Sequence, residues 1–345
     1  MKRVKSILFS PKKVSIFHYL KSNKLTIAIL TGGNVAERGI SLKSAQTIAK
    51  HLDERKYRYY IIELNEKSFT EQSSNTSLDL NDFSFQLNDE KVTFDLVFLI
   101  LHGHPAEDGS ILGYFQLLGI PCTGCSHFVG ALTFNKQMTK DFLRPYSIPM
   151  ADSRLIKKGM SIDVRAIKQM SFPLFVKPNK NGSSYGISKV STEQAITPAI
   201  EKAFQFDDEV IVEQFLAGTE FSNGIFRKGK DIITLPVTEI RSKNDFFDYK
   251  AKYENQSQEI TPAPISRELT QKCQELTRKI YQLLDCKGMV RIDYILRNNE
   301  FYLLEVNTIP GMSEQSIIPQ QVIASGRTLS AFLDAIIEEA LEVDS

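Results

Sequence analysis

Residue types that can bind a metal ion or a phosphate group are concentrated in the segment Met289–Asn307, near the C-terminal end of the sequence. Two apolar runs in this segment flank the polar pair Asn298–Asn299, and this pattern predicts a β-hairpin. Side chains alternate between the two faces of a strand, so the register of the hairpin decides which polar side chains lie together.

Four polar side chains share one face of this hairpin if Asn299 is the centre of a three-residue turn. Asp293 then lies opposite Glu305, and Arg291 lies opposite Asn307. Two carboxylates and an amide oxygen suit a hard cation such as Mg²⁺, which proteins usually bind through one or two carboxylates plus substrate phosphates. A neighbouring arginine suits a phosphoryl group or an oxyanion. The alternative is a solvated hairpin face with one cross-strand ion pair.

A second candidate site is the segment Lys177–Gly186, which contains a loop rich in Asn, Gly and Ser. Glycine-rich loops allow backbone N–H groups to approach phosphates closely, and Lys177 at the end of a predicted strand can add a positive charge. The chain contains no Gly-Lys-Ser or Gly-Lys-Thr, so this loop is not a P-loop. An ordinary turn between strands is the alternative.

Two further segments could bind small molecules. Glu213–Leu216 ends a predicted strand and could bind adenine through backbone groups and an apolar wall, although a plain strand end would look the same. Glu37 follows Gly32–Gly33 by four residues, and a carboxylate there could hold an ammonium group. An acid near a helix start is more often a surface residue that the helix dipole favours.

The elements that would position these residues begin with alternating strands and helices. The predicted elements of this part are strands at 25–31, 57–64 and 95–101, a helix at 41–55 and a hairpin around 88–90. The alternation predicts an open α/β domain with a parallel sheet over residues 25–125. Ligands bind beyond the carboxyl ends of such strands, where Gly32–Gly33 and His102–Gly103 are found.

The rest of the chain predicts two α+β units, over residues 126–216 and 217–345. The predicted helices are 128–146, 191–204, 267–285 and one from about 328. The predicted strands are 153–156, 172–178, 187–190, 209–216, 220–227, 231–240, 288–296 and 300–307, with a polar loop at 241–258.

The charge of the chain is unevenly distributed. Residues 1–24 contain seven Lys and Arg and no acid, which leaves 35 basic and 41 acidic residues in the remainder, a net of −6. This acidic body gives no electrostatic reason to expect a nucleic-acid partner. The basic segment has no apolar run long enough for a secretion signal, so we interpret it as a loosely packed extension. No stretch approaches the ~18 apolar residues of a membrane span.

The four cysteines do not form a metal or redox motif. Cys122 and Cys125 make one CxxC pair, but a zinc ribbon needs a second pair, and Cys273 and Cys286 are too far apart in sequence to supply it. We expect reduced, structural thiols of a cytosolic protein.

Together these segments resemble the ATP-grasp family and, within it, the D-alanine–D-alanine ligases. The resemblance extends from about residue 25 to residue 345. The matching motifs, in order along the chain, are Gly32–Arg38, His102–Gly109, Gly182–Gly186, Phe247–Tyr253, Arg291–Asp293 and Glu305–Met312. It implies an ATP-grasp fold and an enzyme that joins two D-alanine molecules with ATP and two Mg²⁺ ions (Mn²⁺ being possible), for peptidoglycan synthesis.

The resemblance also implies roles toward the nucleotide and the metal. Lys136 and Lys177 would contact phosphates, and Glu220 would bind the ribose hydroxyls. The adenine site would be formed by Glu213, Gln214, Phe215 and Leu216, and the metal ligands would be Asp293, Glu305 and Asn307. Lys252 would act toward the nucleotide from the loop 241–258, which closes over the active site in the family.

Roles toward the amino-acid substrates follow in the same way. Glu37 would hold the ammonium group of the first D-alanine, in a network with Ser183 and Tyr253. The other residues implied are His102 near the first carboxylate, Arg291 and the Gly311 N–H group at the oxyanion, and Ser316 at the second carboxylate. Tyr253 favours an amine as the nucleophile, although relatives that use D-lactate, D-serine or another acceptor are the alternative.

The sequence departs from the family pattern at three places. Pro105–Ala106 stands where glycine is common, Lys180 where arginine is frequent, and Lys250 where an acid is usual. Lys180 keeps the charge but loses the bidentate geometry of arginine, and Lys250 alters the charge of the closing loop. The resemblance further implies a cytoplasmic homodimer without a membrane or nucleic-acid partner.

Overall fold

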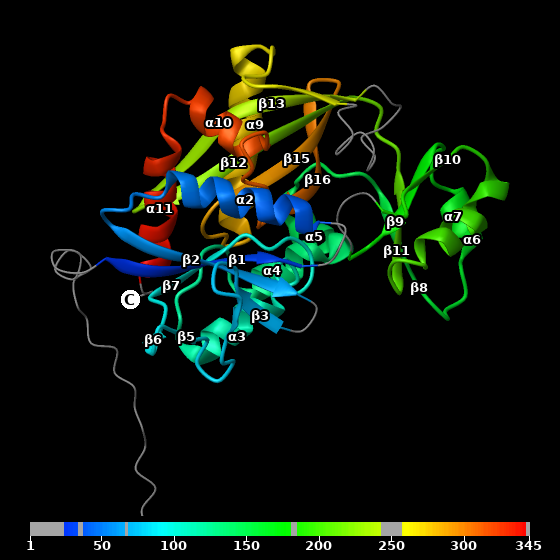
Figure 1. Cartoon of the computed structure of the whole chain (residues 1–345). Helices are drawn as coiled ribbons and strands as arrows, with labels where there is room; N and C mark the ends of the chain where they lie inside the picture. The colour runs from blue at the N-terminus through cyan, green and yellow to red at the C-terminus, as the bar shows by residue number, and fades with distance from the viewer. Residues whose placement is uncertain (1–23, 34–36, 66–67, 181–184, 243–256, 343–345) are drawn as a thin grey trace, which may run out of the picture.

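The computed structural model of the chain describes residues 24–33, 37–65, 68–180, 185–242 and 257–342. Apart from Lys24, the predicted extension 1–24 lies outside these residues. The described residues fold into three larger sheets with helices packed against them, and a further two-stranded sheet (Figure 1). This arrangement agrees with the predicted mixture of an open parallel-sheet region followed by α+β units.

Among the described residues, the first sheet has the strand order β4-β3-β2-β1-β7. Its strands are β1 (Leu25–Gly32), β2 (Tyr57–Asn65), β3 (Ser68–Glu71), β4 (Thr76–Ser77) and β7 (Leu96–Leu99). β1 pairs in parallel with both β2 and β7, as predicted, because its apolar side chains are buried on both faces. β3 and β4 extend the sheet in antiparallel pairing and were not predicted.

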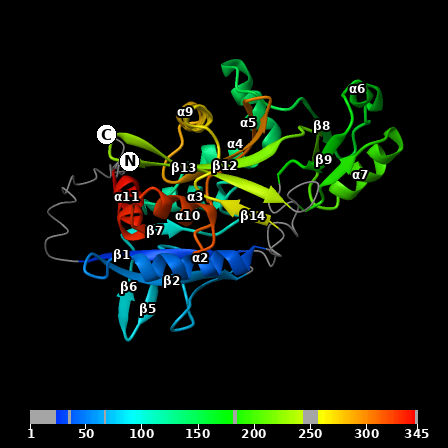
Figure 2. The ribbon, with the colours of Figure 1, turned by 90° about the horizontal axis from the view of Figure 1, so that it is seen from above.

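Helix α2 (Arg38–His51) packs against β1 and lies along the first sheet (Figure 2). It begins three residues before the predicted start and ends four residues before the predicted end. The end is early because Leu52 is extended and Asp53 accepts a hydrogen bond from the Arg55 N–H group, which closes a turn. The small predicted hairpin is present as β5 (Phe85–Leu87) and β6 (Glu90–Val92).

The second sheet, with the order β10-β9-β11-β8, lies to one side of the molecule (Figure 1). Its strands are β8 (Ser153–Lys157), β9 (Leu174–Pro178), β10 (Ser188–Val190) and β11 (Glu209–Gln214). Helices α6 (Val164–Lys168) and α7 (Ile196–Ala203) and the 3₁₀ turn η2 (Glu193–Ala195) accompany it. The sheet has an apolar core of its own around Leu174, Val176 and Ile200.

The third sheet has the order β14-β13-β12-β15-β16 in the part of the chain that the structure describes. Its strands are β12 (Thr219–Lys228), β13 (Asp231–Ser242), β14 (Ser257–Ile260), β15 (Val290–Arg297) and β16 (Glu300–Asn307). Helices α9 (Arg267–Leu283), α10 (Ile317–Ala324) and α11 (Leu329–Leu341) pack against it. β14 and α10 were not predicted, and most of the predicted loop 241–258 lies outside the described residues.

The predicted single helix at 128–146 is wrong. It is divided into α4 (His127–Phe134), α5 (Lys136–Leu143) and the 3₁₀ turn η1 (Arg144–Tyr146). The break occurs at Asn135, which has a ψ of 98° and accepts a hydrogen bond from the Met138 N–H group at 3.0 Å. Asparagine favours such an N-cap over a helix interior. Helix α3 (Ser110–Leu118), which precedes α4, was also not predicted.

The predicted residue pairs of the late hairpin are confirmed, but its predicted turn is wrong. Asn298 and Asn299 have φ angles of 51° and 61° and form a two-residue turn, because Arg297 pairs with Glu300. A β-bulge then adds one residue, Leu304, to β16. Beyond the bulge the register matches the one that a three-residue turn would give.

The predicted reduced state of the cysteines agrees with the structure. All four cysteines lie in described segments, and none of them forms a disulfide. Burial raises the pKa of Cys122 and of Cys273, as expected for structural thiols that remain protonated. Within the described ranges no helix is both long and apolar enough to cross a lipid bilayer.

Candidate active site

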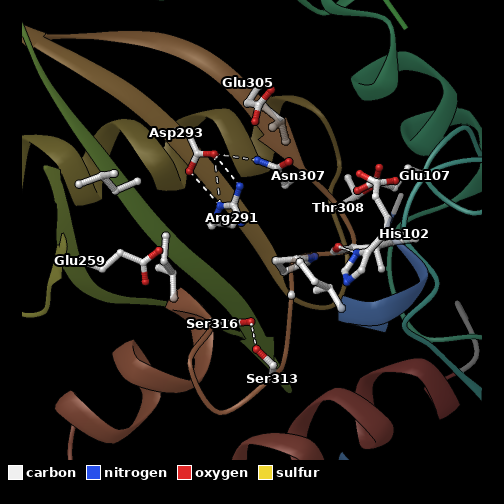
Figure 3. Close-up of a pocket in the computed structure, with 18 of the residues that line it drawn as sticks. His102, Glu107, Glu259, Arg291, Asp293, Glu305, Asn307, Thr308, Ser313 and Ser316 are labelled. Carbon is white, nitrogen blue, oxygen red and sulfur yellow. Dashed lines mark hydrogen bonds and ion pairs between the residues drawn. The ribbon is translucent and has the colours of Figure 1, made fainter. Parts of the chain in front are cut away.

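A cavity of about 610 Å³ is enclosed by residues from the first sheet region, the α4–α5 connection and one face of the third sheet (Figure 3). Several of its lining residues are predicted site residues, namely Glu37, His102, Lys136, Glu220, Arg291, Asp293, Glu305, Asn307, Gly311 and Ser316. Glu107, Glu259 and Gln320 also line the cavity, and no role was predicted for them.

The hairpin β15–β16 brings its four polar residues together on the cavity face. Arg291 pairs with Asn307 and Asp293 pairs with Glu305 across the two strands. Asp293 Oδ2 accepts hydrogen bonds from Arg291 Nη2 at 2.7 Å and from Asn307 Nδ2 at 3.0 Å (Figure 3). These contacts bring the four side chains together at the cavity, which favours a polar site over an ordinary solvated hairpin face.

Burial and charge act in opposite directions on the arginine of this group. Burial alone would lower the pKa of Arg291, but attraction to Asp293 and Glu305 raises it above its usual range. Asp293 is itself buried and receives a further hydrogen bond at 2.6 Å from the hydroxyl of Ser222, which lies directly opposite on β12. Ser222 was not predicted, because its contact depends on the pairing of strands about 70 residues apart.

Helix α2 positions two loops of the cavity through two buried serines. Ser41 Oγ accepts the His102 N–H group at 3.1 Å, and Ser44 Oγ accepts the Met312 N–H group at 3.0 Å. The serines are about one helical turn apart, so both lie on the same buried face of α2. Glu37 precedes the first residue of the helix and also lines the cavity.

His102 is a neutral, buried imidazole. Its Nδ1 lies 3.0 Å from the Ile309 carbonyl oxygen, to which it donates, and its Nε2 has no partner in the described structure. Burial lowers the pKa of His102 to about 4, against the effect of the hydrogen bond to Ile309 and with a smaller contribution from the Arg291 charge. At neutral pH its Nε2 therefore presents a lone pair.

Glu107 is a cavity acid for which no role was predicted, although it lies in the motif His102–Gly109. Its Oε2 accepts the Gly103 N–H group at 3.1 Å. Burial, reinforced by the nearby Glu37 charge, raises the pKa of Glu107 to about 8. This environment favours the protonated form of Glu107.

The loop that leads into α10 brings Gly311 close to Ser316. A Cβ atom at position 311 would lie 2.9 Å from Ser316 Oγ, so a larger side chain would displace this hydroxyl. Ser316 is the N-cap residue of α10, and its Oγ lies 2.7 Å from Ser313 Oγ. Lys136, on the other side of the cavity, is the first residue of α5, and burial lowers its pKa.

The structure does not bring Lys177 and Glu213–Leu216 into the lining of this cavity. Lys177 and Glu213 lie on the adjacent strands β9 and β11 of the second sheet, and Lys177 Nζ is 2.5 Å from Glu213 Oε2. Lys140 of α5 pairs with the other carboxylate oxygen of Glu213 and donates to the Ala151 carbonyl oxygen at 2.8 Å. Burial would raise the pKa of Glu213, but the two lysines lower it to about 2.

The remaining predicted residues of the adenine site surround the end of β11. The Gln214 N–H group donates to the Asp152 carbonyl oxygen at 2.9 Å, and Leu216 is buried. Lys189 Nζ lies 4.5 Å from the centre of the Phe215 ring. Ser183, Lys252 and Tyr253 lie outside the described residues, so the structure does not test their predicted roles.

The comparisons with known proteins agree with this geometry. The family model "D-ala D-ala ligase N-terminus" matches residues 26–125, and "D-ala D-ala ligase C-terminus" matches residues 145–338. D-alanine–D-alanine ligases of Flavobacterium johnsoniae and Phocaeicola vulgatus are 46% and 44% identical, and each match covers 91% of this chain and 99% of the relative.

Solved structures are also similar. The VanG D-Ala:D-Ser ligase from Enterococcus faecalis has a TM-score of 0.83 at 31% identity, over 92% of this chain and 100% of that one. The D-alanine–D-alanine ligase from Bacillus anthracis complexed with ATP has a TM-score of 0.75 at 28% identity, over 92% and 97%. The cavity residues, the fold and these matches agree, and the chain belongs to the D-alanine–D-alanine ligase family.

Proposed function

We propose that this protein joins two D-alanine molecules to form D-alanyl-D-alanine, with conversion of ATP to ADP and phosphate. The observation that carries the proposal is the cavity face on which Arg291, Asp293, Glu305 and Asn307 meet. A related ligase was solved in complex with ATP. Relatives at 44–46% identity are D-alanine–D-alanine ligases, which favours D-alanine over D-serine or D-lactate as the acceptor.

The donor set of the hairpin fits Mg²⁺ bound together with nucleotide phosphates. Asp293 and Glu305 supply carboxylates, and Asn307 can supply an amide oxygen. No group of three or more His, Cys, Asp or Glu side chains that could hold a metal ion occurs within the described residues. Two Mg²⁺ ions, or Mn²⁺ in their place, would therefore depend on the phosphates for part of their coordination, and would neutralise charge on the transferred phosphoryl group.

In the first step, the carboxylate of the first D-alanine attacks the γ-phosphate of ATP and forms an acyl phosphate. Glu37 holds the ammonium group of this substrate, together with Ser183 and Tyr253. Arg291, Lys136 and Lys177 offset the negative charge of the phosphates, because positioning and electrostatics dominate phosphoryl transfer. Glu213, Gln214, Phe215 and Leu216 form the adenine site, Glu220 binds the ribose, and Lys252 acts from the closing loop.

In the second step, the amine of the second D-alanine attacks the acyl carbon and phosphate leaves. Arg291 and the Gly311 N–H group stabilise the tetrahedral oxyanion, and the loss of one such donor costs roughly 3 kcal/mol of barrier. Ser316 binds the carboxylate of the second substrate. His102 lies near the first carboxylate, where its Nε2 needs a proton in order to donate, since its Nδ1 is used by Ile309.

Further proposals concern the setting of the enzyme. We expect a homodimer in the cytoplasm that supplies peptidoglycan synthesis, with domains at 25–125, 126–216 and 217–345. The substrates D-alanine and ATP are small, charged and water-soluble, which is consistent with this location. Gel filtration with light scattering would test the dimer.

Phosphate release from ATP tests the reaction directly. The purified protein is given D-alanine, L-alanine, D-serine and D-lactate, singly and in pairs, and the products are identified by mass. We expect D-alanine alone to support the release of one phosphate for each dipeptide, and L-alanine to be inert. Intact ATP in the presence of D-alanine, or a predominantly mixed product, would contradict the proposal.

A further inference from the structure

Glu259 is an acid of the cavity that the proposed reaction does not use. It lies on β14 opposite Ile240 of β13, which in turn lies opposite Glu220 of β12, so Glu259 shares the cavity face of the sheet. Gln320 Nε2 donates to Glu259 Oε2 at 3.0 Å and to the Gln315 carbonyl oxygen at 2.8 Å. Gln320 thus connects the acid to the turn that ends at Ser316.

The position of Glu259 relative to Arg291 distinguishes it from the other acids. Figure 3 shows Glu259 and Ser316 on one side of Arg291 and Glu305 on the other side. Glu107 and Glu37 are close enough to each other for their charges to interact. Glu259 therefore lies on the side of Ser316, which the proposed function assigns to the second substrate.

The charges of the substrates require a further partner on that side. Each D-alanine brings one ammonium and one carboxylate, and buried charges need a partner. Glu37 is assigned to the first ammonium, Glu220 to the ribose, and Asp293 and Glu305 to the metal ions. Glu259 accepts a hydrogen bond from the neutral Gln320, and the positive charge of Arg291 acts on it from a distance. No cation in the described ranges lies within 4 Å of its carboxylate, so a substrate ammonium can take that place.

We propose that Glu259 receives the ammonium group of the second D-alanine while Ser316 receives its carboxylate. This assignment rests on the proposed function. It places the nitrogen on the side of Arg291 that faces Ser316, next to the oxyanion that Arg291 stabilises. An ammonium has no lone pair, so it passes one proton to the Glu259 carboxylate before the resulting amine attacks the acyl carbon. The departing phosphate takes the second proton as the amide forms. The assignment also makes Glu259 a specificity determinant, because an acceptor that carries a hydroxyl in place of the ammonium lacks the charge that a carboxylate attracts.

The test compares Glu259→Gln and Glu259→Asp with the native enzyme over a wide range of D-alanine concentrations, which resolves one KM for each of the two substrates. Glu259→Gln should raise the second KM roughly tenfold or more, equivalent to about 1.4 kcal/mol. The first KM should stay within about twofold of the native value. Glu259→Asp, which keeps the charge, should recover part of the loss.

A second measurement separates the role in specificity from a structural one. With D-alanine and D-lactate in competition, Glu259→Gln should shift the product ratio toward the ester by roughly tenfold, since only the amine loses a partner. Glu314→Gln is the matched control, because Glu314 is an exposed acid of the neighbouring loop that pairs with Lys50. It should change neither KM nor the product ratio.

The outcomes are distinguishable. If the native enzyme makes no dipeptide, the proposed function fails. If it makes dipeptide but Glu259→Gln leaves the second KM and the product ratio unchanged, or raises both KM values equally, the assignment of Glu259 is wrong. Should Glu259→Gln not fold, as judged by thermal melting, Gln320→Met releases Glu259 instead and should raise the second KM alone.

Discussion

Replacing Lys140 by methionine should destabilise the second sheet and weaken ATP binding. Lys140 is buried and shares the carboxylate of Glu213 with Lys177. The pKa of Glu213 falls from its usual 4.5 to about 2, which corresponds to about 3 kcal/mol in favour of the folded state at neutral pH. Burial also lowers the pKa of Lys140, and the cost of removing this lysine from water offsets part of the gain.

Two cations act on the one carboxylate of Glu213, so the cluster as a whole favours the folded state. Since Lys177 remains in Lys140→Met, we expect a loss of about 2 kcal/mol rather than the 3–5 of a fully broken buried pair. The melting temperature should fall by roughly 5 °C. The KM for ATP should rise severalfold, because Lys177 is then the sole partner of Glu213 and is less able to contact phosphate.

The sign of the pH dependence follows from the lowered pKa of Glu213. The folded state binds this proton less readily than the unfolded state, so the stabilisation is present above pH 4.5 and is lost as the pH falls toward about 2. Lys140→Met should raise the pKa of Glu213 and reduce this contribution. The difference in stability between the native protein and the variant should therefore be largest near neutral pH and smaller at pH 3.

Urea unfolding measures the coupling free energy between the side chains of Lys140 and Glu213 in a double-mutant cycle. The cycle compares the native protein with Lys140→Met, Glu213→Gln and the double variant. Lys158→Met is the matched control, since Lys158 belongs to an exposed ion pair with Asp208 at 3.5 Å and should contribute less than about 0.5 kcal/mol. A coupling below about 0.5 kcal/mol, or equal losses in Lys140→Met and Lys158→Met, would refute this account of the cluster.

Three further substitutions test the cavity. Arg291→Lys should lower kcat by about 10²-fold or more in steady-state assays, because lysine cannot reproduce a bidentate guanidinium at the oxyanion; a change below fivefold would argue against its role. Ser222→Ala should weaken Mn²⁺ binding, measured by electron paramagnetic resonance, by roughly tenfold, because Asp293 loses its 2.6 Å hydrogen bond. Ser44→Ala should lower kcat by about tenfold, because the Met312 N–H group loses its acceptor, and Ser44→Thr should retain more activity.

Much of the fold was predictable because many strands and helices show their apolar pattern within their own residues, without reference to the rest of the chain. The parallel strand β1 and the hairpin β15–β16 carry continuous or alternating apolar residues, and both were predicted close to their observed bounds. Helix α10 was missed because Pro319 interrupts its pattern. That proline lies in the first turn of the helix, where its missing N–H group costs nothing.

The site was predictable where neighbours in sequence are also neighbours in space. Asp293 and Glu305 come from one hairpin, so their pairing followed from a local pattern. Lys140 and Glu259 were missed because their partners, Glu213 and Gln320, lie 73 and 61 residues away. No spacing rule brings such residues together, and only the packing of separate sheets and helices does so.

The extra residue in β16 has a consequence for the two sides of the strand. Phe301 and Leu303 are buried in the core of the third sheet, whereas Glu305, which has the same parity, lines the cavity. In an unbroken strand, residues two apart point the same way, and Glu305 would enter the apolar core without a partner. The additional leucine, Leu304, reverses the alternation of side chains midway along β16. One hairpin therefore contributes apolar side chains to the protein core near its turn and polar side chains to the cavity near its other end.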